Sequence, residues 1–166
     1  MKESLETEIA KATEADAEGI KQIIDSYAFK EDGSGQLIPL TLAQIKQAIK
    51  HGWFYTAKAG EAVIGCGSVA EYNGIAEFRS WAVREEYHEQ GIGEKLAEAC
   101  IEQAKNNGHK TLHALTQEQN ASRLLKLGFY SNGPGKKNSP PEKLAKDCAK
   151  CPIYDRCNET AMAKAL

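Results

Sequence analysis

Residues 81–96 read WAVREEYHEQGIGEKL and join three kinds of local structure. Strand-like residues lead into a polar loop that ends in Gly91, Ile92 and Gly93, and a helix begins there. The N-terminus of a helix presents unpaired N–H groups and a partial positive charge. Glycine lets the main chain approach a ligand without a Cβ in the way. The segment therefore predicts a strand–loop–helix unit that receives a phosphate group.

Two common phosphate-binding loops are excluded by the same residues. A P-loop needs the pattern Gly-x4-Gly-Lys followed by Ser or Thr, which the sequence lacks. A dinucleotide-binding fingerprint needs a third glycine at the position where this chain has Leu96. For the loop taken alone, a turn that only caps the helix is the alternative interpretation.

The elements predicted on either side of this unit follow the order β-α-α-β-β-β-α-β-α-β. The pairs Thr13 with Asp16 and Thr41 with Gln44 have the spacing of capping residues at the starts of two helices. Two further helices are predicted to run from Gly93 to about residue 106 and over residues 120–127. Strands are predicted at residues 8–12, 53–58, 62–70, 75–83, 111–115 and from residue 129 onward. This order predicts an α+β (mixed α/β) fold with a central mixed sheet flanked by helices.

The composition is that of an ordinary globular protein. The chain has 166 residues, of which 42% are hydrophobic and 27% charged, and this balance excludes disordered, collagen-like and coiled-coil classes. A formal net charge of −2 argues against a broad surface for nucleic acid or anionic membranes. No apolar run approaches the roughly 20 residues of a membrane helix, and residues 1–6 lack an apolar signal core. We therefore expect a cytoplasmic protein without a nucleic-acid or membrane partner. A homodimer is one possible assembly.

Three segments resemble the GNAT superfamily of acyl-CoA N-acyltransferases. Residues 88–93, HEQGIG, are similar to the pattern Arg/Gln-x-x-Gly-x-Gly/Ala, with His88 where Arg or Gln is usual. Residues 76–83, AEFRSWAV, look like the central strand of that family, which ends in an Ala-Val pair. Residues 120–129, NASRLLKLGF, resemble its last helix and the Leu-Gly-Phe ending. The resemblance covers residues 8 to about 130 and implies the GNAT fold.

The resemblance implies acetyl-CoA as the cofactor, held in a V-shaped opening between two parallel strands. The residues that it implies for the pyrophosphate are His88, Glu89, Gln90, Gly91, Ile92, Gly93 and Glu94. The main chain of Trp81, Ala82 and Val83 would pair with the pantetheine arm. Asn120 would bridge to the pantetheine or to water, and a helix N-cap is its alternative role.

Within the superfamily the chain is similar to small proteins of the N-acetylglutamate synthase type. The similarity rests on residues 77–83 and on the patterns around Pro141 and residues 157–162. Those proteins usually carry an arginine in a Leu-x-Pro-Arg-Ser stretch, where this chain reads Leu-Ile-Pro-Leu-Thr over residues 37–41. An arginine there would pair with a substrate carboxylate. The resemblance therefore implies an N-acetyltransferase acting on the amine of a small substrate, with an amino acid such as glutamate as one candidate.

Transfer of an acetyl group to nitrogen needs a neutral amine, and an alkylamine is almost wholly protonated at pH 7. Glu77 lies where GNAT enzymes often carry the base, so the resemblance implies that Glu77 is catalytic. Strict alternation along a strand places Glu77, Arg79 and Trp81 on one face, where Arg79 would bind a substrate carboxylate. A structural Glu–Arg pair is the alternative. Leu124 stands where many members have a Tyr that protonates the leaving thiolate.

Five cysteines divide into two groups. Cys66 and Cys100 lie on predicted apolar faces and are expected to be core residues. Cys148, Cys151 and Cys157 lie close together and predict a zinc or iron–sulfur site, with a disulfide or free thiols as alternatives. Linker-like composition after residue 131 divides the chain into an acetyltransferase domain, residues 1–131, and a cysteine-containing tail packed on it or appended to it, residues 132–166. A non-catalytic CoA-binding or metabolite-binding module and a metal or redox sensor are the alternative functions.

Overall fold

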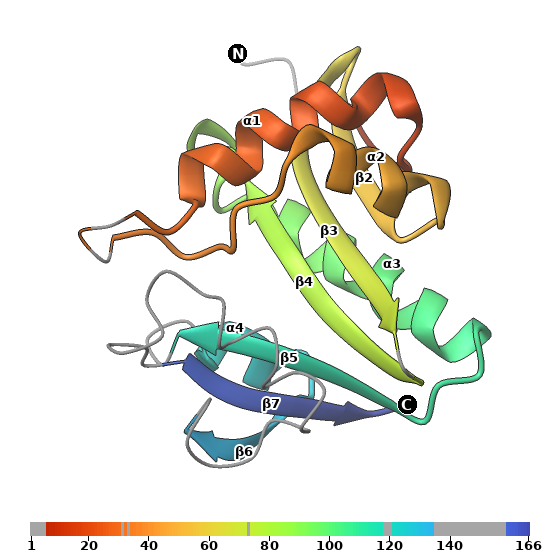
Figure 1. Ribbon diagram of the computed structural model, residues 1–166, viewed down its shortest axis with the longest axis vertical. Helices are drawn as coiled ribbons and strands as arrows, with labels where there is room; N and C mark the ends of the chain where they lie inside the picture. Colours follow the sequence, from red (N-terminus) through yellow and green to blue (C-terminus); the bar gives the residue numbers. More distant parts are fainter. Residues whose placement is uncertain (1–5, 31, 33, 73, 118–120, 135–158) are drawn as a thin grey trace.

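One mixed sheet organises the chain. The computed structural model describes residues 6–30, 32, 34–72, 74–117, 121–134 and 159–166. The strands lie in the order β1-β2-β3-β4-β5-β7-β6, and among these neighbours only β4 and β5 run parallel (Figure 1). The strands are β1 (Thr7–Lys11), β2 (Phe54–Ala59), β3 (Ala62–Tyr72), β4 (Ile75–Val83), β5 (Thr111–Gln117), β6 (Tyr130–Pro134) and β7 (Glu159–Ala165).

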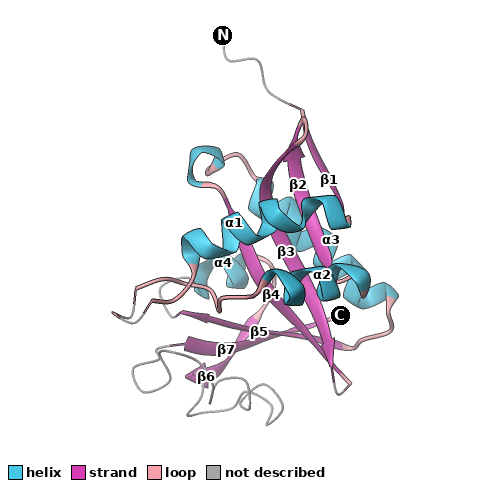
Figure 2. Ribbon diagram, turned by 45° about the horizontal axis from the view of Figure 1, so that its top comes forward, coloured by secondary structure: helices cyan, strands magenta, loops and turns pink. Residues whose placement is uncertain are grey.

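Helices cover both faces of the sheet (Figure 2). The α-helices are α1 (Ala17–Tyr27), α2 (Leu42–Lys50), α3 (Ile92–Asn106) and α4 (Ala121–Lys126). α1 and α2 pack on one face in a cluster that includes Ile20, Ile45 and Phe54. α3 packs on the other face, where Cys100 joins a cluster with residues of β3, β4 and α4. The expected α+β fold, with a central mixed sheet flanked by helices, is confirmed.

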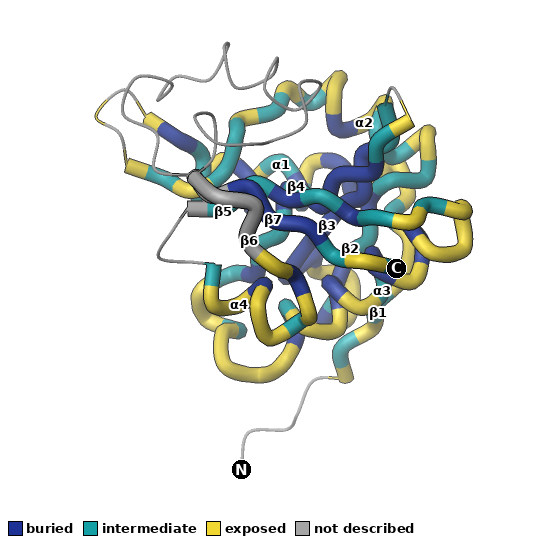
Figure 3. Tube along the Cα trace, turned by 90° about the horizontal axis from the view of Figure 1, so that it is seen from below, coloured by how far each residue is buried: buried dark blue, intermediate teal, exposed yellow. Residues whose placement is uncertain are grey.

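Local sequence signals account for several of these elements. The predicted capping box begins α2, because the Gln44 N–H donates to Thr41 Oγ1 at 3.1 Å and the Thr41 N–H donates to Gln44 Oε1 at 2.8 Å. The apolar stripe of α1 is buried on the sheet, with Ile20 and Ile24 fully enclosed. Buried segments concentrate in the middle of the sheet, and the exposed segments surround them (Figure 3).

Strand β7 was not predicted. It lies between β5 and β6 and pairs antiparallel with both, so residues of the 132–166 segment form an interior strand of the sheet. Met162 is 1% exposed and packs in the cluster of α3 and α4. Its neighbours Ala161 and Ala163 are buried as well. Alanine has little strand propensity, and burial on both faces removes the polar alternation that marks a strand in a sequence.

The parallel pair β4 and β5 separates part-way along its length. The two strands pair only where Ala76–Phe78 meet Leu112–Ala114, although β4 continues to Val83 and β5 to Gln117. Figure 1 shows the two ribbons diverging beyond this contact. Main-chain groups of both strands therefore border an opening of the V shape that the resemblance implied.

A β-bulge at Ser80 changes which side chains of β4 share a face. Between the pairs Ser68↔Arg79 and Cys66↔Ala82 the strand β4 has one residue more than β3, and Ser80 has a positive φ of 54°. Phe78 and Trp81 therefore lie on the same face, with ring centroids 5.2 Å apart. The prediction that Trp81 shares a face with Glu77 and Arg79 was wrong, because strict alternation does not survive an inserted residue.

Candidate active site

A cleft of about 600 Å³ lies beside the end of β4, between the start of α3 and α4. Its lining residues are Trp81, Ala82, Val83, Tyr87, His88, Glu89, Gly91, Ile92, Gly93, Glu94, Glu98, Arg123, Lys126 and Leu127. The residues predicted for the cofactor are thus brought together here, apart from Gln90, which does not line the cleft, and Asn120, which lies outside the described residues. No sequence pattern marked four other lining residues, Tyr87, Glu98, Arg123 and Lys126, as parts of a site.

The loop before α3 is held in an unusual backbone conformation. Gly91 caps the helix with a left-handed φ of 75°, and Glu89 has a φ of 63° although it carries a Cβ. Trp81 Nε1 donates to the Gly93 carbonyl at 2.8 Å and so ties the first turn of α3 to β4. These constraints hold the first turn of α3, whose N–H groups have no partner within the helix, at the cleft that Gly91, Ile92 and Gly93 line.

Tyr27 and His88 meet at the carbonyl of Val83. The Tyr27 hydroxyl donates to Val83 O at 2.7 Å. His88 Nε2 lies 2.8 Å from the same oxygen and 3.1 Å from the Tyr27 hydroxyl. Burial raises the pKa of Tyr27, and the charges of Glu85 and Glu86 add to this effect. No local sequence pattern predicts this contact, since Tyr27 and Val83 are 56 positions apart.

A second, smaller cavity of about 80 Å³ occupies the opening between β4 and β5. Its lining residues are Gln36, Leu37, Phe78, Arg79, Ser80, Trp81, Ala114, Leu115, Thr116, Arg123 and Leu124. Trp81 and Arg123 border both cavities, so the two spaces adjoin. A molecule in the larger cleft can therefore present one end to the smaller cavity.

Glu77 and Arg79 lie together on the face of β4 opposite Phe78. Glu77 is 5% exposed, and its side chain accepts a hydrogen bond from the Tyr72 hydroxyl at 2.6 Å and lies 3.6 Å from Arg79 Nη1. On β5, His113 is its register neighbour. Burial lowers the pKa of His113, so its ring is neutral at pH 7. Its buried Nδ1 has no hydrogen-bond partner among the residues that the structure describes.

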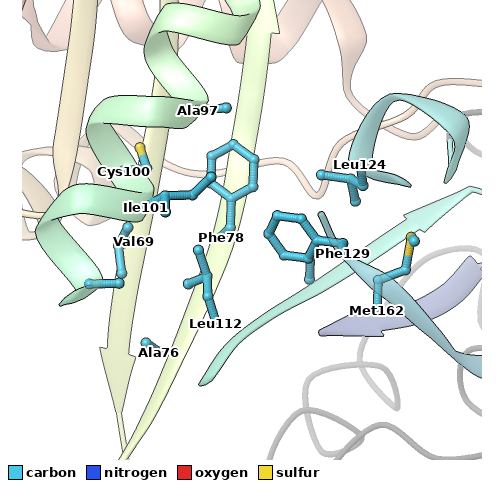
Figure 4. Packing of buried hydrophobic residues seen from close by; sticks show 12 residues of the cluster. Val69, Ala76, Phe78, Ala97, Cys100, Ile101, Leu112, Leu124, Phe129 and Met162 are labelled. Carbon is cyan, nitrogen blue, oxygen red and sulfur yellow. The ribbon is translucent and has the colours of Figure 1, made fainter. Parts of the chain in front are cut away.

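Leu124 is a core residue. It is 3% exposed and points from α4 toward Phe129 (Figure 4). An apolar side chain in this position cannot protonate a leaving group. Tyr130 is another side chain that could protonate the leaving thiolate, but it lies on β6, is 52% exposed and lines neither cavity.

The cysteines that the structure describes are buried and free. Cys66 and Cys100 are confirmed as core residues, and burial raises the pKa of the Cys66 thiol to about 12 and that of Cys100 further. Cys148, Cys151 and Cys157 lie outside the described residues, so the zinc or iron–sulfur site stays a prediction. Over the described ranges no three His, Cys, Asp or Glu side chains are grouped to hold a metal ion.

The same ranges contain no helix with the length and apolar character needed to cross a membrane.

Comparison with known proteins agrees with this architecture. The profile of the acetyltransferase (GNAT) family matches residues 18–129. An N-acetyltransferase of Chlorobaculum tepidum, itself uncharacterised, is 33% identical over 165 residues, which cover 97% of each chain.

Several solved structures share the fold at low identity. N-acetylglutamate synthase from Neisseria gonorrhoeae, complexed with coenzyme A and N-acetyl-glutamate, matches 99% of this chain with a TM-score of 0.79 and 20% identity. This chain spans only 36% of that enzyme's length. A Mycobacterium tuberculosis protein in complex with CoA matches with a TM-score of 0.74 and 21% identity over 96% of this chain and 99% of its own. An acetyltransferase from Salmonella typhimurium with acetyl-CoA matches with a TM-score of 0.71 and 19% identity, over 97% of this chain and 94% of its own.

Proposed function

The chain belongs to the acetyltransferase (GNAT) family, whose members transfer an acyl group from CoA to an amine, and we propose that its acceptor is a small amine that carries a carboxylate. The observation that supports this acceptor is Arg79, a residue that lines the small cavity beside the bulge of β4. A guanidinium binds a carboxylate with two parallel hydrogen bonds, which fixes the orientation of the amine. An amino acid such as glutamate has the required groups.

The larger cleft is the proposed site of acetyl-CoA. Its diphosphate would bind at the loop of Gly91 and Gly93, where the start of α3, with its unpaired N–H groups, lines the cleft. Its pantetheine arm would run along β4 at Trp81, Ala82 and Val83, with the thioester at the small cavity. The carbonyl of Val83 already accepts from Tyr27, so the arm either pairs elsewhere on this edge or displaces that hydroxyl.

Glu77 is the proposed base. Because Glu77 is buried and lines neither cavity, it removes a proton from the ammonium form of the acceptor through a water, and the neutral nitrogen then attacks the thioester carbon. A main-chain N–H near Ala82 or Val83 stabilises the negative charge that develops on the thioester oxygen. The C–S bond breaks with its electron pair on sulfur, and the nitrogen gives a second proton to water, which leaves the N–H of the new amide. CoA departs as a thiolate, which takes its proton from solvent because Leu124 offers none.

The overall proposal is tested by acetyl transfer across a panel of amines. We expect CoA thiol to be released with amino acids such as glutamate and far more slowly with amines of the same size that lack a carboxylate. Acetyl-CoA at about 100 times its Kd stabilises the folded protein by about 2.7 kcal/mol and raises its Tm. The absence of both a Tm shift and CoA release at millimolar acetyl-CoA would contradict the proposal. Adenosine alone is the control ligand.

Arg79→Gln is expected to raise the KM for the carboxylate-bearing acceptor about 10- to 100-fold, because a charge-assisted hydrogen bond contributes about 1.5–3 kcal/mol. The KM for acetyl-CoA changes little, since Arg79 does not line the larger cleft. Steady-state kinetics with a matched pair of acceptors, with and without the carboxylate, measure the effect. Equal losses for both acceptors show that Arg79 serves only as the ion-pair partner of Glu77, and Arg79→Lys is the charge-conserving control.

A further inference from the structure

The cleft has two walls of different charge. The wall formed by the loop and α3 carries three carboxylates, Glu89, Glu94 and Glu98. The opposite wall is α4, where Arg123 and Lys126 line the same space. Loop N–H groups therefore do not make this an anion site by themselves, because the neighbouring carboxylates repel a phosphate.

The two cations project from one face of α4. Residues three apart on a helix are neighbours on its surface, so Arg123 and Lys126 stand side by side. Leu124 sets the rotation of the helix, because its buried side chain packs toward Phe129 on the core side (Figure 4). Because this packing fixes α4, the backbone positions from which both cationic side chains extend are fixed beside the cleft.

Neither cation is committed to an ion pair. Among the described residues the ion pairs involve other lysines and arginines, and Arg123 and Lys126 take part in none. Burial, with Glu85 and Glu86, raises the pKa of Tyr27, and the charge of Arg123 opposes this rise. The charge of Arg123 therefore acts on the Tyr27 hydroxyl, which donates to the Val83 carbonyl.

We propose that Arg123 and Lys126 form a second phosphate-binding arm that holds the phosphate groups of CoA against the loop before α3. The proposal rests on the proposed function, since it takes CoA as the ligand of this cleft. CoA carries a 5′-diphosphate and a 3′-phosphate, which together need more positive charge than one helix N-terminus supplies. A guanidinium and an ammonium facing these groups offset the three carboxylates on the other wall.

The test is the affinity of the full-length protein for CoA, measured by calorimetry with Arg123→Gln, Lys126→Gln and Lys50→Gln. Lys50→Gln is the matched control, because Lys50 is an exposed lysine of α2 and does not line the cleft. We expect each cleft variant to weaken CoA binding about 5- to 20-fold, in keeping with charge-assisted hydrogen bonds at a partly exposed site. The control changes Kd less than about twofold, and Lys126→Arg retains most of the affinity.

Two further measurements identify the interaction. We expect the difference in CoA affinity between each cleft variant and the wild type to shrink as the salt concentration rises from about 50 to about 500 mM, because screening weakens a charge–phosphate contact. Dephospho-CoA, which lacks the 3′-phosphate, shows which phosphate each residue holds, and either assignment supports the proposal. Binding of both cleft variants within twofold of wild type, or a loss that does not depend on salt, overturns it. Failure of the wild-type protein to bind CoA at all overturns the proposed function instead.

Discussion

Glu77→Gln is expected to lower kcat for acetyl transfer about 10²- to 10⁴-fold, the range that a positioned general base contributes. The amide keeps the shape of the side chain and can still accept from the Tyr72 hydroxyl, which lies 2.6 Å from the carboxylate. It cannot take a proton from the acceptor amine. Because the free amine becomes more abundant as the pH rises toward its pKa, the ratio of wild-type to variant activity falls with increasing pH. Initial rates of CoA thiol release between pH 6 and 9, approximately, measure both effects.

Glu61→Gln is the matched control for this substitution, since Glu61 is an exposed carboxylate in the turn between β2 and β3. It leaves kcat unchanged. The competing interpretation is that Glu77 only pairs with Arg79, at 3.6 Å. That interpretation is supported if Glu77→Gln lowers the free energy of unfolding while kcat stays within about threefold of the wild-type value. Unchanged acetyl-CoA affinity in the variant separates a chemical defect from a binding defect.

Phe78→Ala is expected to lower the free energy of unfolding by about 3–5 kcal/mol, the usual cost of removing a buried phenyl ring and leaving a cavity. Phe78 is 3% exposed. Its ring centroid lies 5.2 Å from that of Trp81 and 6.4 Å from that of Phe129. Figure 4 shows it between α3 and the segment of Phe129 and Leu124. Urea denaturation followed by circular dichroism measures the change.

Two companion variants make this prediction specific. Phe78→Leu fills most of the space and is expected to cost less than the alanine variant, so it reports the effect even if Phe78→Ala does not fold. Tyr130→Ala removes a half-exposed ring from β6 and costs about 1 kcal/mol or less. A loss below about 1 kcal/mol for Phe78→Ala would show that the contact between α3 and the far half of the sheet does not depend on this ring.

Features with local causes were predictable from the sequence. The capping box of Thr41 and Gln44 depends on residues three positions apart, and the loop before α3 depends on two glycines and the helix after them. The hairpin of β2 and β3 likewise follows from adjacent strands and a short turn. Each of these signals lies within a few residues of the structure that it predicts.

Features with distant causes were not predictable. The bulge at Ser80 depends on the register of β3 against β4, and a serine in the sequence does not indicate a positive φ. Tyr27 binds a carbonyl 56 positions away. Arg123 becomes part of the cleft only because Leu124 packs against a core assembled from four strands and α3. A single sequence contains the residues of such contacts without showing that they meet.

The place of β7 between β5 and β6 also bears on how the protein is made. Among the described residues, β6 has β7 as its only strand partner, yet the ribosome produces β6 first, at about 5–20 residues per second. Until β7 emerges, the edge of β5 is unpaired and β6 has no sheet to join. The half of the molecule that carries α1, α2 and α3 can condense during translation, whereas the far half waits for residues 159–165. An unpaired strand edge is a template for association with other chains. The nascent protein is therefore most prone to aggregation during this interval.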